Sequence, residues 1–333
     1  MISDRTRAAL RTELRANTVA TIGVIVLVCL VLMAIFAPVL APHDPTDQDS
    51  SRNHQPPVFF GGDDEQTTRM IDGEIRTVTE SNAGSMTYPL GTDSNGRDVL
   101  SRTIYGARTS ILVAFTAMVV SLVVGTTVGM VSGYYSGTTD TVLMRFVDIV
   151  LAFPALLITL AMIGIFGSVN VNIPDPLVVS GLVGDRPTHL TFPVTITLAI
   201  SSVIWVWIAR VARSEAIAAK NEEYVTAART MGMSDLGIIR RHVLPNSITP
   251  ILVLATIQVA SIIIIESSLS FLGFSGTSLS WGYDIAAGRD YLGTSWWLST
   301  VPGLFIVVTV VGINLLGDLL RDALDPGIQR GGV

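Results

Sequence analysis

Long uncharged runs alternate with short polar segments along most of the chain. Because about 20 apolar residues, at 1.5 Å rise each, span the roughly 30 Å hydrocarbon layer of a bilayer, a run of this length predicts a membrane helix. The six runs of this kind cover residues 19–40, 111–131, 149–165, 190–209, 248–265 and 299–316. None shows the ~10-residue alternation of a membrane barrel. The pattern therefore predicts an all-α integral membrane protein with about six transmembrane helices.

Composition agrees with this reading. The chain is 49% hydrophobic and 14% charged, whereas soluble domains average about 25% charged residues. The uncharged stretch over residues 16–42 exceeds the 7–15 residues of a signal-peptide core, so the first run is expected to be an uncleaved anchor. The single cysteine, Cys29, lies in that run and is expected to be a small packing residue.

Two local features are expected around the third run. Pro154 lies inside it and predicts a kink, because proline removes a backbone donor and clashes with the preceding turn. Arg145 and Asp148 stand three positions apart just before the run, so they share a helix face and are predicted to form a structural ion pair.

The placement of basic residues predicts the orientation. If the N-terminus is cytoplasmic and six spans alternate, the cytoplasmic parts hold 13 of the 21 lysines and arginines. Basic enrichment of short cytoplasmic loops is the positive-inside rule. Both termini and the polar loop between the fourth and fifth runs are therefore predicted to be cytoplasmic.

The chain shows no motif of an enzyme that works alone. It has no GxxxxGK[ST] phosphate loop, no His/Cys spacing typical of zinc and no GxSxG elbow. We expect no catalytic residue, no cofactor or metal in this chain, and no nucleic-acid partner.

The most informative segment is a polar island over residues 222–245, held between two membrane runs. Its composition predicts two short helices that meet at Gly232, since glycine accepts the left-handed conformation that ends helices. Ser234 or Asp235 is expected to cap the second helix.

Residues 226–245 of this island resemble a family signature. The segment begins with Thr226-Ala227-Ala228, reaches Gly232 after three further residues, and ends nine residues later with His242-Val243-Leu244-Pro245. This spacing resembles the "EAA" motif of binding-protein-dependent ABC importer permeases. Thr226 stands where the motif has Glu, and His242 where it has Ile. The histidine is usual in the peptide/nickel branch. Whether Glu222 or Glu223 replaces the missing carboxylate stays open.

Further segments resemble the C-type inner-membrane subunit of the dipeptide/oligopeptide/nickel branch. They are residues 90–102, 268–274 with 280–282, 296–303 and 314–326. The resemblance covers about residues 90–333 closely, whereas an acidic insertion, about residues 48–88, is longer than is usual in the family. This insertion is expected either to help dock the binding protein or gate the pore mouth, or to be a plain solvated loop.

The resemblance implies the ABC importer type I permease fold in a multi-pass protein of the inner or plasma membrane, in contact with membrane lipid. It implies half of a translocation pathway, with a homologous B-type permease subunit, two ATPase subunits that use ATP and Mg, and an extracytoplasmic substrate-binding protein as partners. The chain itself is then no enzyme. The residues that the resemblance assigns to coupling with the ATPase are Glu223, Thr226, Ala227, Ala228, Arg229, Gly232, His242, Leu244 and Pro245.

The expected organisation follows from these observations. It comprises a cytoplasmic arm (1–18), a first transmembrane helix (19–40), an extracytoplasmic segment with the acidic insertion (41–108), a core permease domain of five transmembrane helices (109–320) with a cytoplasmic coupling loop (214–246), and a cytoplasmic tail (321–333). Dipeptides, oligopeptides and nickel chelates remain open as substrates. A secondary transporter and a membrane scaffold remain as rival classes.

Overall fold

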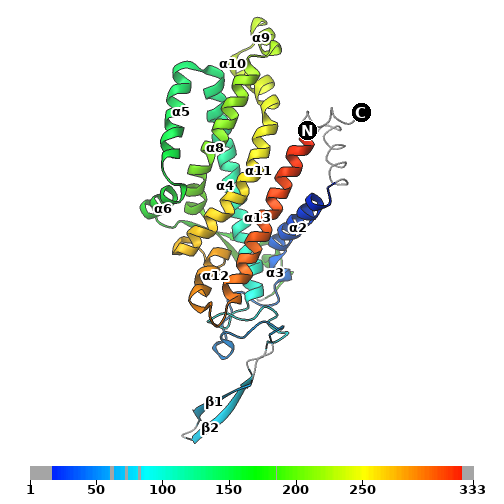
Figure 1. The fold of residues 1–333 in the computed structure, drawn as a ribbon, viewed down its shortest axis with the longest axis vertical. Helices are drawn as coiled ribbons and strands as arrows, with labels where there is room; N and C mark the ends of the chain where they lie inside the picture. Colours follow the sequence, from blue (N-terminus) through cyan, green and yellow to red (C-terminus); the bar gives the residue numbers. More distant parts are fainter. Residues whose placement is uncertain (1–16, 61–63, 72–73, 82–83, 185, 325–333) are drawn as a thin grey trace.

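The computed structural model describes residues 17–60, 64–71, 74–81, 84–184 and 186–324. The main helices follow one long axis, with α9 and α10 at one end and the β1–β2 hairpin at the other (Figure 1). Most of the expected arm (1–18) and of the expected tail (321–333) lies outside the described residues.

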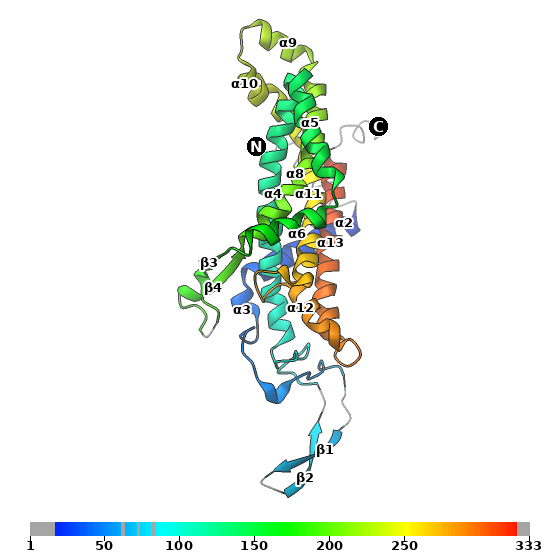
Figure 2. The same ribbon diagram turned by 90° about the vertical axis from the view of Figure 1, so that its left-hand side faces the viewer.

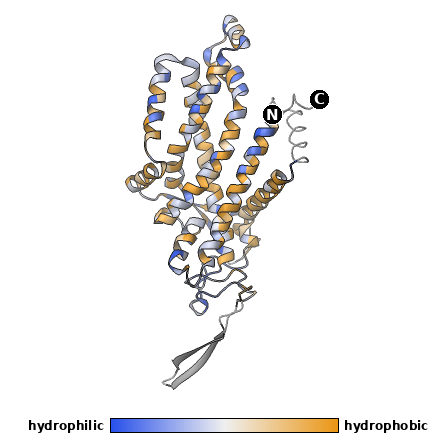
Figure 3. Ribbon diagram, viewed as in Figure 1, coloured by the Kyte–Doolittle hydropathy of each residue, from blue (hydrophilic) through white to orange (hydrophobic). Residues whose placement is uncertain are grey.

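Five described helical stretches are long and apolar enough to cross a membrane. They are α2 (Thr18–Ile35), α4 (Val99–Tyr135), α8 (Val194–Lys220), the stretch Asp235–Phe274 that contains α11 (Leu244–Leu269), and α13 (Trp297–Leu324). The pair α5 (Gly137–Ala152) and α6 (Ala155–Phe166) meets at 91° and, counted together as one broken span, brings the number of candidate spans to six. Figure 3 shows apolar residues along most of the length of these helices. The predicted fold class, an all-α membrane protein of about six spans, is confirmed.

Pro154 accounts for the break in the third span. Phe153 and Pro154 both have extended ψ angles, 142° and 129°, so the helix stops before it restarts at Ala155. After the break, α6 lies across the bundle (Figures 1 and 2). The kink predicted from the sequence is therefore a complete interruption of the helix.

A stripe of glycines lets α4 pack closely against α8. Gly125, Gly129 and Gly133 recur every fourth residue on α4, and all three face α8. A Cβ atom placed on Gly129 would lie 2.4 Å from the carbonyl oxygen of Ala209 and 2.6 Å from the Cβ of Ala212. Small residues at this spacing let two helix backbones approach each other within a membrane. We call this contact the glycine seam.

Shorter elements connect the spans. They are α3 (Ala37–Leu40), η1 (Ser50–Arg52), β1 (Asp64–Ile71), β2 (Glu74–Ser81), β3 (Asn170–Pro174), α7 (Pro176–Val179), β4 (His189–Pro193), α9 (Glu223–Thr230), α10 (Asp235–Ile238), the π-helical η2 (Ile239–Val243) and η3 (Ser270–Phe274), α12 (Trp281–Gly288) and η4 (Arg289–Tyr291). Two antiparallel hairpins result, β1–β2 and β3–β4. The β3–β4 hairpin leaves the side of the bundle (Figure 2).

The glycine seam generates a prediction about stability. Gly129→Val should separate α4 from α8, because its side chain would meet backbone atoms that cannot move aside. Overpacking of this kind costs about 1–3 kcal/mol, so the midpoint of thermal unfolding in detergent should fall by about 1–4 °C for a chain of this length.

Gly164→Val is the matched control. Gly164 also lies in an apolar helix, α6, but a Cβ atom there would meet nothing within 4 Å. Equal unfolding midpoints for the two variants would contradict the structural role of the seam.

Candidate functional site

The polar island forms the tip of the molecule at one end of the long axis, between α8 and α11 (Figure 1). It folds as α9, a turn at Gly232, α10 and the π-helical η2, which runs directly into α11. The two short helices and their meeting point agree with the sequence prediction.

Backbone hydrogen bonds close the turn at Gly232. The Gly232 N–H donates to the carbonyl of Arg229 over 3.0 Å, and the Met233 N–H donates to that of Ala228 over 3.1 Å. This pair of bonds satisfies two carbonyls at the end of α9. Gly232 has φ +80°, and a Cβ atom there would meet nothing within 4 Å. Glycine is therefore required at this position for its conformation and not for space.

Ser234 caps the second helix, since its Oγ accepts a hydrogen bond of 3.3 Å from the Gly237 N–H. The carboxylate of Asp235, the other candidate cap, instead accepts a hydrogen bond from Tyr134. The sequence had left these two residues as alternatives.

One side of α9 packs against the protein's own core. Val225 and Ala228 are each 1% exposed and belong to one apolar cluster with Ile238, Ile239 and Val243. Ala228 therefore packs against its own chain, and its assignment to coupling stays a prediction. The remaining surface is open: Glu223, Thr226, Ala227, Arg229 and Gly232 are exposed, as are Met231 and Leu236.

Tyr134, next to last in α4, fixes both helices of the island. Its hydroxyl donates to Asp235 Oδ1 over 2.7 Å and accepts from Arg229 Nη2 over 3.2 Å. The Arg229 guanidinium also lies over the tyrosine ring, 5.7 Å from its centroid. The hydrogen bond to Tyr134 raises the pKa of Arg229, so this side chain stays charged. The sequence gave no signal for Tyr134, because it stands about 90 residues away in the chain.

His242 joins the start of α9 to the start of α11. Its ring lies 6.1 Å from that of Tyr224, and Asn246 Nδ2 donates both to the Tyr224 hydroxyl (3.1 Å) and to the His242 carbonyl (2.7 Å). Leu244 and Pro245 open α11, directly after the π-helical η2. His242 and Leu244 therefore hold the island against the rest of the protein, whereas Pro245 is exposed.

Glu223 lies in the first turn of α9, where the helix dipole favours a negative charge. It precedes Thr226 by three positions and so shares its face of the helix. A carboxylate is thus available beside the position where the family motif carries one.

The ion pair predicted between Arg145 and Asp148 is wrong about the partner. Asp148 accepts a hydrogen bond of 2.7 Å from Arg210 Nη2 on α8, and the described ion pairs include none with Arg145. Nearby, Arg213 of α8 binds both carboxylate oxygens of Asp140, at 2.5 and 2.6 Å. The acidic residues of α5 face α8, so arginines on the neighbouring helix reach them first.

Within the bundle, α4 and α11 are joined through a buried carboxyl group. Glu266 is 1% exposed and accepts hydrogen bonds from Ser110 and Ser270, both at 2.9 Å, and from Ser267 at 3.3 Å. No described ion pair includes it. Hydroxyl groups, and not a basic side chain, satisfy this carboxyl.

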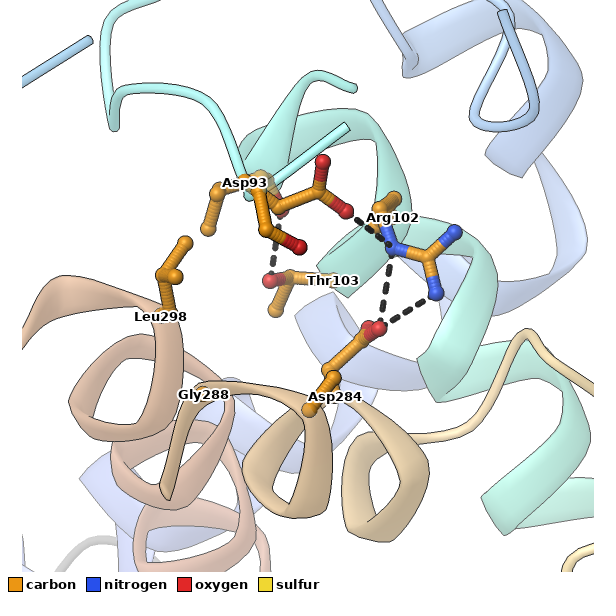
Figure 4. A pocket seen from close by; sticks show the side chains of 9 residues that line it. Asp93, Arg102, Thr103, Asp284, Gly288 and Leu298 are labelled. Carbon is orange, nitrogen blue, oxygen red and sulfur yellow. Dashed lines mark hydrogen bonds and ion pairs between the residues drawn. The ribbon is translucent and has the colours of Figure 1, made fainter. Parts of the chain in front are cut away.

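At the opposite end of the molecule, Arg102 forms a second polar centre, the outer clamp (Figure 4). Its guanidinium donates to Asp284 Oδ1 of α12 (Nε, 2.9 Å), to the Ser278 carbonyl (2.5 Å) and to the Pro45 carbonyl (3.2 Å). The Arg102 side chain is 3% exposed, so these bonds are shielded from water. One arginine therefore joins α4, α12 and the segment after α3.

The outer clamp is electrically balanced. Asp93 pairs with Arg97 at 2.6 Å, and Asp284 pairs with Arg102. Burial raises the pKa of Asp284, and Arg102 opposes that rise. Two cations and two anions leave no net charge to hold a ligand, so the arrangement is a structural lock. No group of three metal-ligating side chains occurs among the described residues.

The outer clamp predicts a pH-dependent loss of stability. Because the pKa of Asp284 is raised in the folded protein, this group's contribution to the free energy of unfolding falls as pH rises. Arg102→Met leaves the buried carboxylate without its partner, which costs about 3–5 kcal/mol near neutral pH. The loss should be smaller at pH 4.5, where Asp284 can take up a proton.

Unfolding of the detergent-solubilised protein at pH 4.5 and 7 measures this difference. The double variant Arg102→Met, Asp284→Leu is the control, and it should recover most of the loss at pH 7 because it removes both members of the Arg102–Asp284 pair and so leaves neither charge buried without the other. A pH-independent loss in the single variant would contradict the assignment.

Two family models match the chain. "Binding-protein-dependent transport system inner membrane component" matches residues 125–330, and "N-terminal TM domain of oligopeptide transport permease C" matches residues 6–57. The first match contains the whole polar island, α8 and α11.

Curated relatives match along almost the entire chain. The dipeptide transport system permease protein DppC of Haemophilus influenzae is 33% identical over 95% of this chain and 93% of its own length. The oligopeptide transport system permease protein OppC of Bacillus subtilis is 32% identical over 95% of this chain and 88% of its own. Among solved structures, the MetNI methionine ABC transporter in an inward-facing form matches with a TM-score of 0.49 and 17% identity, over 67% of this chain and 96% of that one.

Proposed function

The chain belongs to the family of binding-protein-dependent transport system inner membrane components, and on that premise we propose that it imports peptides as one permease subunit of an ATP-driven transporter. It is a multi-pass membrane protein of that family, with no enzymatic role of its own. The peptide substrate is proposed from relatives that are named as dipeptide and oligopeptide permeases.

The observation that supports the coupling mechanism is that one side of the polar island is packed against the protein and the opposite side is exposed. Its inner side is fixed to the protein's own core through Val225 and Ala228, and to α4 through Tyr134. Its outer side exposes Ala227, Met231 (78% exposed) and Leu236 (55% exposed) beyond the ends of the spans. A rigid support with an exposed small-and-apolar surface suits a docking element that transmits force.

We therefore assign the exposed surface of α9 and the Gly232 turn to contact with an ATPase subunit. That subunit would bind ATP and Mg, and its movement would push the island and bias the spans between two arrangements. The partners are a homologous B-type permease subunit, two ATPase subunits and an external substrate-binding protein.

The rival classes make different predictions. The broken α5–α6 span is one feature of secondary transporters, but family membership favours an ATP-driven system. A scaffold would show no response to substrate. ATP hydrolysis by the assembled complex that rises with loaded binding protein separates an importer from a scaffold, and a comparison of peptides with nickel chelates tests the substrate class.

Gly232→Val should uncouple transport. A β-branched residue at φ +80° costs at least the roughly 1–2 kcal/mol of a left-handed L-residue, so the turn should rearrange and displace α9. In proteoliposomes, ATP hydrolysis should persist while uptake falls about tenfold or more. Gly232→Asn is the matched control, since asparagine tolerates this conformation. Full uptake by the valine variant would refute the coupling assignment.

The proposed orientation places the island in the cytoplasm and the β1–β2 end outside. Met86 and Met231 are 81% and 78% exposed, so they form a matched pair for cysteine labelling in a Cys29→Ser background. On intact cells, a membrane-impermeant maleimide should label Met86→Cys and leave Met231→Cys unlabelled until the cells are opened. The reverse pattern would invert the topology and remove the coupling site from the ATPase.

A further inference from the structure

An open pocket lies in the groove between α5 and α8, in the half of the bundle that carries the polar island (Figure 1). Its volume is about 340 Å³, and it is lined by Met144 and Asp148 of α5 and by Arg210 and Arg213 of α8. We call it the arginine pocket. One water occupies only about 30 Å³ in the liquid, so the pocket has room for a phosphate-sized group.

The ion pairs inside the pocket leave donor groups of Arg210 unused. Arg213 holds Asp140 with two hydrogen bonds, from Nε and Nη2. Arg210, in contrast, forms one described hydrogen bond, from Nη2 to Asp148 Oδ1 over 2.7 Å. Its side chain is 48% exposed, so Nε and Nη1 are available to a ligand. A guanidinium group with free N–H groups is well suited to a phosphate, because the two match in geometry as well as in charge.

Arg145 adds a positive charge that no described carboxylate neutralises. It precedes Asp148 by three positions, so the two residues share one side of α5. Its side chain is exposed, and it takes part in none of the ion pairs among the described residues. The three arginines here, Arg145, Arg210 and Arg213, accompany two aspartates, Asp140 and Asp148, which leaves a net charge of +1. The outer clamp is balanced, whereas this group can still attract an anion.

Apolar side chains flank the charged groups on both helices. Trp207 precedes Arg210 by three positions on α8 and is 47% exposed. On α5, Ile149 (58% exposed) and Phe153 (59%) follow Arg145 by four and eight positions, in the direction that leads away from the polar island. An apolar track therefore starts beside the positive charge and continues toward the middle of the bundle. This arrangement matches an amphiphile with an anionic headgroup and an acyl chain.

The position of the arginine pocket favours a lipid over a soluble anion. Both helices that form it belong to candidate membrane spans. Exposed tryptophans such as Trp207 are typical of the boundary between the acyl chains and the headgroups. In the proposed orientation this boundary is the cytoplasmic one, where anionic lipids bind to basic pockets between membrane helices. A soluble anion would use the arginines and leave the apolar track uncovered.

We propose that the arginine pocket binds the phosphate group of an anionic phospholipid, with one acyl chain along Ile149 and Phe153. Arg145 and Arg210 hold the phosphate oxygens. The bound lipid joins α5 to α8 just before the break at Pro154, where the third span has no helix of its own to continue it. The choice of the cytoplasmic leaflet rests on the orientation given under the proposed function, whereas the binding of the lipid does not.

The test measures lipid binding to the complete transporter, delipidated in detergent. The probes are phosphatidylglycerol and phosphatidylcholine with identical acyl chains, and native mass spectrometry gives the apparent dissociation constant of the first bound lipid. The pocket variants are Arg145→Gln and Arg210→Gln. Arg321→Gln is the matched control, because Arg321 is also an exposed arginine on a membrane helix, α13, at the proposed cytoplasmic side.

The unaltered transporter should bind phosphatidylglycerol about tenfold more tightly than phosphatidylcholine. Each pocket variant should weaken the binding of phosphatidylglycerol about fivefold, which is the usual contribution of one basic residue near a membrane surface, and leave that of phosphatidylcholine unchanged. Arg321→Gln should change neither. Asp148→Asn should strengthen the binding of phosphatidylglycerol, because it removes a competing negative charge. A purely structural role of the Arg210–Asp148 pair would give no such gain.

Three results would overturn the inference. The first is equal binding of the two lipids by the unaltered transporter, and the second is an equal effect of Arg145→Gln and Arg321→Gln. The third is displacement of phosphatidylglycerol by millimolar glycerophosphoglycerol, its headgroup without acyl chains, which would make the pocket a site for a soluble phosphate. A transporter whose ATP hydrolysis ignores the binding protein would refute the proposed function and leave these dissociation constants as they are.

Discussion

The glycine seam is the constraint on which the rest of the structure depends. Gly125, Gly129 and Gly133 let α4 approach α8 until a Cβ atom would meet backbone atoms at about 2.5 Å. Hydrophobic burial does not drive two helices together in lipid, so close van der Waals packing must supply the attraction. The α4–α8 pair then provides the surface on which other helices pack. Helices α5 and α6 pack on α8, while α11 contacts both helices of the seam. Tyr134 follows the last glycine by one residue, so the seam also sets where the polar island is held.

Charged groups occupy the ends of this bundle, and hydroxyl groups serve its interior. The outer clamp around Arg102 and the pairs of α8 with α5 each match an arginine to a carboxylate on another helix. Inside, the Glu266 carboxyl depends on three serines. This division follows from the free-energy cost of burying charge. A buried ion pair requires both charged side chains to be well placed, whereas a serine hydroxyl can rotate to donate to whichever acceptor lies nearby.

Features that depend on local chemistry could be predicted from the sequence, whereas those that depend on which helices become neighbours could not. The six apolar runs, the break at Pro154, and the turn at Gly232 with its capping serine all follow from composition or backbone preference, and the structure has each of them. The partner of Asp148 was mispredicted, because spacing within one helix cannot reveal that Arg210 lies opposite. The periodicity of the eight-residue α9 did not fix which of its sides packs inward, and the structure places Val225 and Ala228 on that side. The glycine seam was readable as GxxxGxxxG at residues 125–133, although only the structure identifies α8 as the helix it meets.

The length of α4 has a mechanical consequence. At 37 residues it is about 55 Å long, well beyond the roughly 30 Å of the hydrocarbon layer. One uninterrupted helix therefore carries Arg102 of the outer clamp near its start and Tyr134, which holds the island, near its end. A continuous helix resists compression along its axis, so a displacement imposed at one end reaches the other without an intermediate joint. The coupling free energy between two sites is the same in both directions. If binding at the outer end shifts the equilibrium position of α4, binding at the inner end must therefore change the affinity at the outer end by the same factor.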